Sequence, residues 1–354
     1  MRLQSQGYRV AVIGASSLVG KELLTVLEER HFPVSQFVKL EGTGAAELPI
    51  VDLDEPVIPG IDDGRDISGE EFDFAFIAAR PDRLPGFLRL QSRRPHVVID
   101  LDQALPELSS AAPRIPLLER GSPPAAPLEG GSEQQLVVSA HPAATVLSIL
   151  LLRLAAEFEI KTAVAQVFNP AASLGSRAIE ELQKQTVNLL SFQKIPRSIF
   201  GAQLAFNLLP RLGGSGSIVM SSLEERIRGE LQRCLAGRAP LPALRLFQAS
   251  VFYSMAISLY VETSKPAAPA AVGRAVAGER VRLGRAADQA PSQVGVTGSA
   301  EILVDPIIPD GGRETGLWIW AAVDNLRLAA ENAVEIAEGL AGQKRGAGVS
   351  GRAN

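Results

Sequence analysis

The N-terminus of the chain carries the feature that most restricts its fold, a short apolar run that enters a helix through a glycine turn. Residues 8–13 read YRVAVI, a pattern typical of a parallel strand buried on both faces. Gly14 and Gly20 bracket the turn, and the apolar spacing after it predicts a helix over 21–30. The start of a helix offers free backbone N–H groups to a phosphate. Dinucleotide binding is therefore one interpretation of this turn, and a simple preference for small residues is the other.

The candidate cofactor-binding residues are those of the turn itself. Ser17 stands where such turns usually carry a middle glycine. The cofactor would be NADP or NAD, although nothing else in the pattern requires a cofactor. The predicted contacts are Gly14, Ser16, Ser17, Leu18, Val19 and Gly20.

Strands and helices continue to alternate through the first half of the chain. This alternation predicts an α/β fold with a Rossmann-type doubly wound parallel sheet. The helix after Pro142 is apolar on nearly every side, so we expect it to be buried between layers. The predicted elements are strands at 37–40, 72–79, 97–101 and 136–140, helices at 82–93 and 143–157, and a proline-rich surface loop at 104–130.

The second half of the chain changes character, because strands follow one another with few helices between them. This order predicts an α+β domain with a mixed or antiparallel sheet. Trp318 and Trp320 fall on one face of their strand, which makes them either core or dimer surface. The predicted elements are strands at 162–168, 244–251, 256–262 and 315–323, helices at 176–190, 222–236 and 325–340, and a loop at 264–300.

Composition excludes several classes of function. A length of 354 residues suggests two domains, and a net charge of −4 without a basic block argues against nucleic acid and anionic membranes as partners. The N-terminus lacks the apolar core of a signal peptide, and the apolar run at 147–152 is too short to span a bilayer. We therefore expect a cytoplasmic protein. No cluster of Cys, His, Asp and Glu has metal-ligand spacing, so no metal site is predicted.

Several segments, in order and with matching spacing, resemble the aspartate-semialdehyde dehydrogenase family over nearly the whole chain. They are 12–20 (VIGASSLVG), 179–186 (IEELQKQT), 206–210 (FNLLP) and 324–330 (DNLRLAA). The resemblance implies a homodimer. It also implies a dinucleotide-binding domain over 1–142 and 325–345, a substrate and dimerisation domain over 143–324, and a flexible tail over 346–354.

The residues that carry the family's reaction are missing from this chain. In that family a cysteine forms a thioester, a histidine moves the proton, and NADPH delivers hydride. The resemblance places Ala144 at the position of the nucleophile and Met255 at that of the acid/base. Asn169 replaces the family's glutamine, and Gln248 replaces the arginine that clamps the substrate carboxylate. This pattern resembles the Usg-type branch, which keeps the fold and lacks the catalytic cysteine.

The positions that bind the cofactor in this family also differ in this chain. The segment after the second strand, which in the family receives the 2′-phosphate, reads LEGTG over 40–44, with Glu41 and no arginine. The glycine pair that lies under the nicotinamide becomes Ala79 and Arg80. These changes weaken the prediction of dinucleotide binding.

Two other residues could carry chemistry. His141 lies beside the lost nucleophile, where it is either a base without an obvious thiol or serine to activate, or a cap of the helix over 143–157. Cys234, the single cysteine, lies in a charged amphipathic helix and is either a relocated nucleophile or an ordinary packing residue.

Three functions remain open from the sequence. The first is a non-catalytic homologue that binds or regulates an unknown protein or small molecule. The second is an active NAD- or NADP-dependent semialdehyde dehydrogenase of amino-acid biosynthesis, against which the missing thiol, imidazole and guanidinium count heavily. The third is a module that senses a dinucleotide without turnover.

Overall fold

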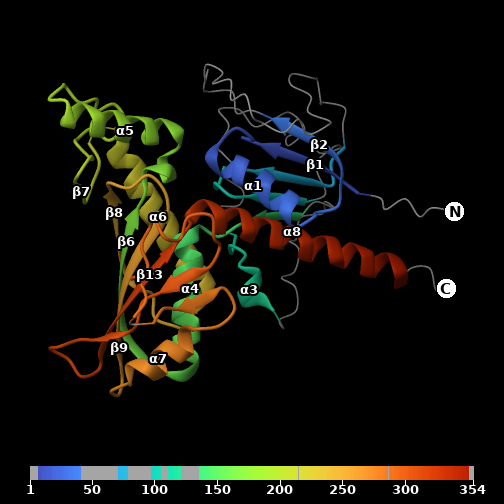
Figure 1. Cartoon of the computed structure of the whole chain (residues 1–354). Coiled ribbons are helices and arrows are strands. Elements are labelled where there is room, and N and C mark those ends of the chain that lie inside the picture. The colour runs from blue at the N-terminus through green and yellow to red at the C-terminus, as the bar shows by residue number, and fades with distance from the viewer. Residues whose placement is uncertain are drawn as a thin grey trace. The chain divides into compact units, whose positions relative to one another are not determined.

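The computed structural model describes residues 7–40, 71–78, 97–104, 111–120, 135–213, 215–285 and 287–350. The chain divides into two compact units. The first unit is Met1–Ala140 with Ala329–Asn354, and the second is His141–Leu328. Figure 1 shows the elements of both units in chain order. The sequence prediction of a helix over 82–93 lies outside the described residues, as do Glu41, Ala79 and Arg80.

In its described residues, the first unit is built on a five-stranded parallel sheet of order β2-β1-β3-β4-β5. β3 and β4 are buried at every position, as expected for strands covered on both faces. The Rossmann-type parallel sheet predicted from the sequence is therefore confirmed. The strands are β1 (Tyr8–Ile13), β2 (Val34–Leu40), β3 (Phe74–Ile77), β4 (Val97–Asp100) and β5 (Gln135–Val138), and the helices are α1 (Leu18–Glu29), α3 (Pro116–Glu119) and α8 (Asn325–Ser350).

The last helix supplies part of the core of the first unit. Ala330, Ala333 and Ala337 of α8 are buried in the same cluster as Val12 and Leu23. Small side chains at spacings of three and four let the helix pack closely against its neighbours. α8 runs to Ser350, so the prediction that this helix ends at 340 is wrong, and part of the predicted tail is helical.

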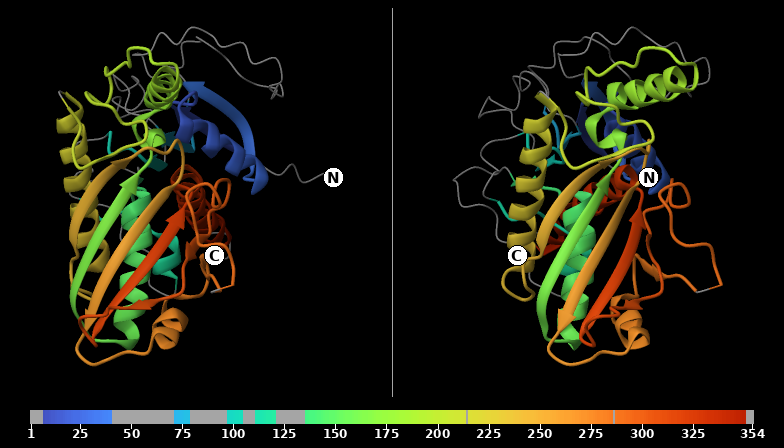
Figure 2. Two further views of the ribbon diagram at one scale, coloured as in Figure 1. Left: turned by 60° about the vertical axis from the view of Figure 1, so that its left-hand side comes forward. Right: turned by 90° about the vertical axis from the view of Figure 1, so that its left-hand side faces the viewer.

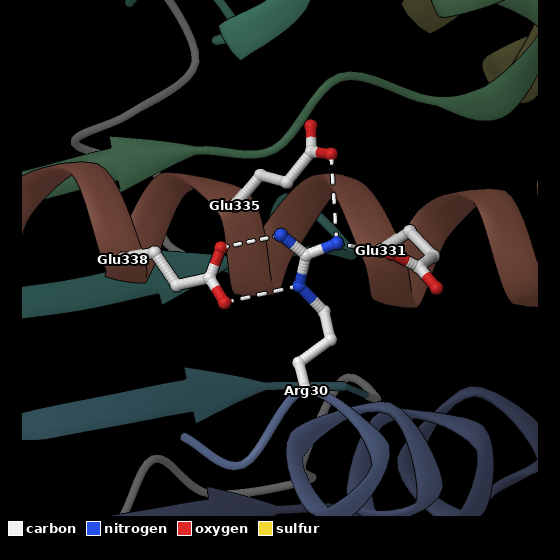
Figure 3. Close-up of polar contacts among 4 residues, drawn as sticks. All are labelled: Arg30, Glu331, Glu335 and Glu338. Atoms are coloured by element: carbon white, nitrogen blue, oxygen red, sulfur yellow. Dashed lines mark hydrogen bonds and ion pairs between the residues drawn. The ribbon is translucent and has the colours of Figure 1, made fainter. Parts of the chain in front are cut away.

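Arg30, directly after α1, ties that helix to α8 (Figure 3). Its Nε donates to Glu338 Oε1 at 3.0 Å, and its Nη1 donates to Glu331 Oε2 at 3.0 Å. Glu335 Oε1 lies 3.8 Å from the same Nη1. The hydrogen bond to Glu338 outweighs the effect of burial and raises the pKa of Arg30, so the guanidinium remains charged.

The second unit contains, in its described residues, an eight-stranded mixed sheet. β6 pairs parallel to β8 on one side and antiparallel to β9 on the other. The right-hand view of Figure 2 shows the strands in front of α4. The mixed sheet predicted for this half is confirmed. The strands are β6 (Ile160–Asn169), β7 (Leu208–Leu209), β8 (Ala243–Ala249), β9 (Met255–Thr263), β10 (Val281–Leu283), β11 (Ile302–Val304), β12 (Ile308–Pro309) and β13 (Gly316–Val323).

Helices α4 (Pro142–Glu157) and α6 (Ser215–Leu235) contact each other within the second unit. The burial predicted for α4 is observed, because Pro142 to Leu151 are all buried. The remaining helical elements are η2 (Ala171–Leu174), α5 (Ser176–Leu190) and α7 (Pro269–Val276).

Two predicted loops contain regular structure. The loop predicted over 264–300 includes α7 and β10, because Pro269 opens the helix and an alanine-rich segment continues it with Val272 and Val276 buried. The loop predicted over 104–130 includes the short helix α3, which also has a proline at its first position.

Candidate functional site

The glycine turn of the first unit is held in shape by both of its glycines. Gly14 has φ +77°, a left-handed conformation that favours glycine. A Cβ on Gly20 would lie 2.1 Å from the carbonyl oxygen of Gly14, so only glycine fits there. The two glycines are therefore required by the backbone of the turn, whether or not a nucleotide binds.

Ser17 is the N-cap of α1. Its Oγ accepts a hydrogen bond from the Gly20 N–H at 3.0 Å and donates to the Ala78 carbonyl at 3.4 Å. α1 begins at Leu18, so the sequence prediction of a start at 21 is wrong. The earlier start places Leu18, Val19 and Gly20 in the first helical turn.

Two backbone donors at the start of α1 remain available to an anion. Within the described part of the chain, the N–H groups of Leu18 and Val19 have no hydrogen-bond acceptor. Both residues are partly exposed, and Ser16 beside them is exposed. This geometry fits one phosphate group of a dinucleotide. The segment that would select between NADP and NAD, from Glu41 onward, lies outside the described residues.

The positions related to the family's chemistry gather in the second unit. Asn169 ends β6 and pairs with Gln248 of β8, while Phe168 pairs with Ala256, next to Met255 at the start of β9. α4 and β6 run in opposite directions and are joined by residues 158–159, so the start of α4 lies at the same end of the unit as the end of β6 (Figure 1). We call Ala144, Asn169, Gln248 and Met255 the sheet-end site.

The sheet-end site contains neither a nucleophile nor an acid/base among these four side chains. All four residues are fully buried, and two of them, Ala144 and Met255, end in methyl groups. Gln248 Nε2 donates to the backbone carbonyl of Asn169 at 2.9 Å, and Asn169 Nδ2 donates to Gln248 Oε1 at 3.3 Å. The amide at the clamp position is thus bound to its neighbouring strand.

His141 caps the buried helix α4. Its Nδ1 accepts the Ala143 N–H at 3.1 Å, which is the capping alternative of the sequence prediction. Burial, and then the charge of Arg226, hold the pKa of His141 well below its usual value. The imidazole is therefore neutral, with its proton on Nε2.

Glu230 was not anticipated from the sequence. Its Oε2 accepts the backbone N–H of His141 at 2.6 Å, and its Oε1 accepts from Arg226 Nε at 2.8 Å. The side chain of Glu230 is fully buried. An i, i+4 pair on a charged helix ordinarily indicates a solvent face, so the sequence contained no signal of this burial.

Cys234 lies in α6, as predicted, and is half-buried. Its backbone carbonyl accepts a hydrogen bond from Arg238 at 3.0 Å. Across the described residues, no group of three His, Cys, Asp or Glu side chains could hold a metal ion. No described helix is long and apolar enough to cross a membrane.

Aromatic side chains gather on one face of the second sheet. Trp318 is 38% exposed, and its ring lies 4.9 Å from that of Tyr260. Phe168 contacts both Trp320, at 5.7 Å, and Phe247, at 5.9 Å. Of the two alternatives from the sequence, core or dimer surface, the exposure of Trp318 favours a surface.

The two units together define a class of protein. A parallel sheet with a glycine turn before its first helix, a mixed sheet, and a last helix that returns to the first unit are typical of two-domain dehydrogenases. The chain belongs to the semialdehyde dehydrogenase family, since the model of the semialdehyde dehydrogenase dimerisation domain matches residues 151–328.

Relatives with two different names match nearly the whole chain. An aspartate-semialdehyde dehydrogenase from Rickettsia bellii is 29% identical over 94% of this chain and 97% of its own length. A USG-1 protein homolog from Pseudomonas aeruginosa is also 29% identical, over 94% of this chain and 98% of its own. The solved structure of a probable aspartate-semialdehyde dehydrogenase from Pseudomonas aeruginosa has a TM-score of 0.76 at 28% identity, covering 95% of this chain and 98% of that chain. The predicted relationship is confirmed.

Proposed function

We propose that this chain is a non-catalytic member of the semialdehyde dehydrogenase family, with a binding or regulatory role. The observation that supports this proposal is the composition of the sheet-end site. A methyl group at Ala144 cannot form a thioester, and the thioether of Met255 cannot carry a proton. Removing groups that work as a unit leaves little of the original rate.

His141 does not offer a substitute base. Its Nδ1 is occupied by the Ala143 N–H, and its neutral imidazole carries the remaining proton on Nε2. The neighbouring hydroxyl of Thr145 is buried. These contacts favour a capping role over an acid/base role.

A turnover assay tests the proposal. The purified chain is mixed with aspartate semialdehyde, phosphate and NADP or NAD, and the formation of reduced cofactor is followed. We expect no turnover, while a catalytically competent aspartate-semialdehyde dehydrogenase provides the positive control. Turnover that survives Ala144→Ser and disappears in His141→Ala would contradict the proposal and point to a new active site. Turnover of the unchanged chain would favour the active dehydrogenase alternative.

A second candidate function is dinucleotide sensing without turnover. The N–H groups of Leu18 and Val19 at the start of α1, which have no acceptor among the described residues, favour it. Calorimetric titration with NADP and NAD separates this function from a scaffold that binds no nucleotide. Loss of the titration signal in Leu18→Pro, which removes one of these N–H groups at the first helical position, where proline is tolerated, but not in the exposed substitution Thr25→Val, would assign binding to the turn.

We also propose that the chain works as a homodimer. The matched family model describes a dimerisation domain, and it spans the strands that carry the aromatic face of Trp318 and Tyr260. Partly exposed aromatic clusters are typical of surfaces that another protein covers. The domain limits and the cytoplasmic location expected from the sequence remain predictions.

A further inference from the structure

A loop of the second unit, residues 291–298, lies against the end of the sheet at which β6 stops and β9 starts. Gln293 Nε2 donates to the Ser254 carbonyl at 2.9 Å and lies 3.5 Å from the Phe168 carbonyl. Each of these carbonyls belongs to the residue directly before a member of the sheet-end site. The loop, which we call the strap, therefore contacts the chain on both strands beside that site.

The two ends of the strap are anchored away from Ser254. At its start, Trp320 Nε1 of β13 donates to the Pro291 carbonyl at 2.8 Å. At its end, the Gly298 N–H donates to Asp324 Oδ2 at 2.8 Å. The middle of the strap can therefore move off the sheet while both of its ends stay in place.

Two side-chain contacts hold the middle of the strap on Ser254. Gln293 provides the first, and the hydroxyls of Ser254 and Thr297, 3.2 Å apart, provide the second. Because Thr297 Oγ1 donates to the Gln293 carbonyl at 3.3 Å, the Ser254 hydroxyl is the donor in the second contact. Val296 is buried, but Val294 is 86% exposed. The strap thus buries little apolar surface, which is typical of segments that open locally.

Ser254 is held in an unfavourable conformation beneath the strap. Its φ is +64°, in the left-handed region that costs free energy for residues other than glycine, and its side chain is fully buried. Such a conformation persists only where the surroundings hold it. The strap binds both the carbonyl and the hydroxyl of Ser254. Release of Ser254 would relieve this strain, whereas the two contacts oppose that release.

We infer that the strap is a gate, which opens while the rest of the second unit stays folded. Opening breaks the two contacts to Ser254 and exposes this residue, at the start of β9, to solvent. The anchors at Trp320 and Asp324 keep the strap close enough to shut again. The gate would control access to this end of the sheet. The inference goes beyond the proposed function and does not rest on it, because opening involves no chemical step.

Thiol labelling tests the gate. In the full chain with Cys234→Ser, Ser254→Cys places one thiol beneath the strap. In a second protein with the same background, Ser148→Cys places a thiol at an equally buried position of α4, where the serine Oγ has no hydrogen-bond partner among the described residues. The rate of reaction with dithiobis(nitrobenzoate) reports how often each thiol is exposed. We expect Ser254→Cys to react at least about tenfold faster than Ser148→Cys, because local opening costs less than global unfolding.

Gln293→Leu tests which contact keeps the gate shut. In the Ser254→Cys protein it removes the hydrogen bond to the carbonyl of residue 254, and the labelling rate should rise about fivefold. The rate of Ser148→Cys should not change. Gln183→Leu makes the same substitution at an exposed position of α5 and should alter neither rate. Equal labelling of the two thiols, or no acceleration by Gln293→Leu, would overturn the inference.

Hydrogen exchange provides a measurement without introduced cysteines, which decides the matter if Ser254→Cys fails to fold. The unchanged chain is compared with Gln293→Leu. The amides of residues 291–298 should exchange about fivefold faster in the variant, while those of α4 keep their protection. Unchanged exchange of the strap would overturn the inference. Equal acceleration in α4 would do so as well, because it would show opening by global unfolding.

Discussion

At the scale of single residues, His141 shows how a side chain beside a lost active site can keep a structural task. Its Nδ1 caps α4, and its backbone N–H binds Glu230. His141→Ala removes the cap and should lower the free energy of unfolding by about 0.5–2 kcal/mol. His141→Asn restores a capping acceptor and should recover most of that loss. Urea denaturation at neutral pH measures both, and equal stability of all three proteins would contradict the capping role.

The acid sensitivity of His141 follows from its pKa, which folding lowers well below the ordinary value of 6.5. The folded state therefore binds fewer protons than the unfolded state. Its stabilising contribution is complete above about pH 6.5 and is lost as the pH falls towards the folded pKa. We expect His141→Asn to remove this part of the pH dependence. Unfolding curves from neutral to mildly acidic pH that stay parallel for both proteins would contradict this assignment.

Glu181 of α5 has a pH dependence of the same sign, because its folded pKa is also lowered. Burial alone would raise the pKa of Glu181, but hydrogen bonds from Ser198 and from the Ile199 and Phe200 N–H groups lower it. Its contribution is present above the unfolded pKa, near 4.5, and is lost as the pH falls through the lower folded pKa.

Glu181→Gln should therefore destabilise the chain by about 1.5–3 kcal/mol at neutral pH, because the hydrogen bonds lose a charged acceptor. The difference should shrink below the folded pKa. Glu180→Gln, at an exposed neighbouring position, is the matched control and should change stability little. Denaturant titrations at neutral pH and at a pH below the folded pKa of Glu181 measure the free energy of unfolding of each protein.

At the scale of elements, the contact between α1 and α8 depends on the guanidinium of Arg30. Arg30→Lys keeps the charge but cannot bind Glu338 through two nitrogens, so we expect a loss of up to about 1 kcal/mol at this partly exposed site. Arg30→Ala should cost more, and high salt should reduce the difference. Hydrogen exchange of the α8 amides measures how strongly this helix is held. Unchanged protection of these amides in Arg30→Ala would contradict a stabilising contact between α1 and α8 through Arg30.

An element could be predicted from the sequence where its local residue pattern agreed with its surroundings in the folded protein. The strands at 8–13 and 97–100 were predictable, because their apolar runs suit a sheet covered on both faces. α7 was missed, because alanine, glycine and proline read as a loop until Val272 and Val276 find a surface to pack on. The residues of the candidate site were likewise predicted only in part. Residues 144, 169, 248 and 255 were located by resemblance, but burial of Glu230 depends on the neighbouring helix.

At the scale of the whole molecule, the aromatic face of the second sheet predicts the oligomeric state. If a second copy covers Trp318 and Tyr260, Trp318→Arg should shift the chain from dimer to monomer. Leu241→Arg places the same charge at another exposed apolar residue and should leave the dimer intact. Sedimentation velocity distinguishes these outcomes, and a monomeric unchanged chain would contradict the proposed homodimer.

The discontinuity of the first unit has a consequence for biosynthesis. Its sheet comes from residues before 140, but Ala330, Val334 and Leu340 of its core are translated after the entire second unit. A ribosome therefore releases the continuous second unit with all its strands while the first still lacks a helix. We expect the emerging chain to complete the second unit first. A nascent chain stalled before residue 329 should carry an uncovered apolar surface that chaperones recognise.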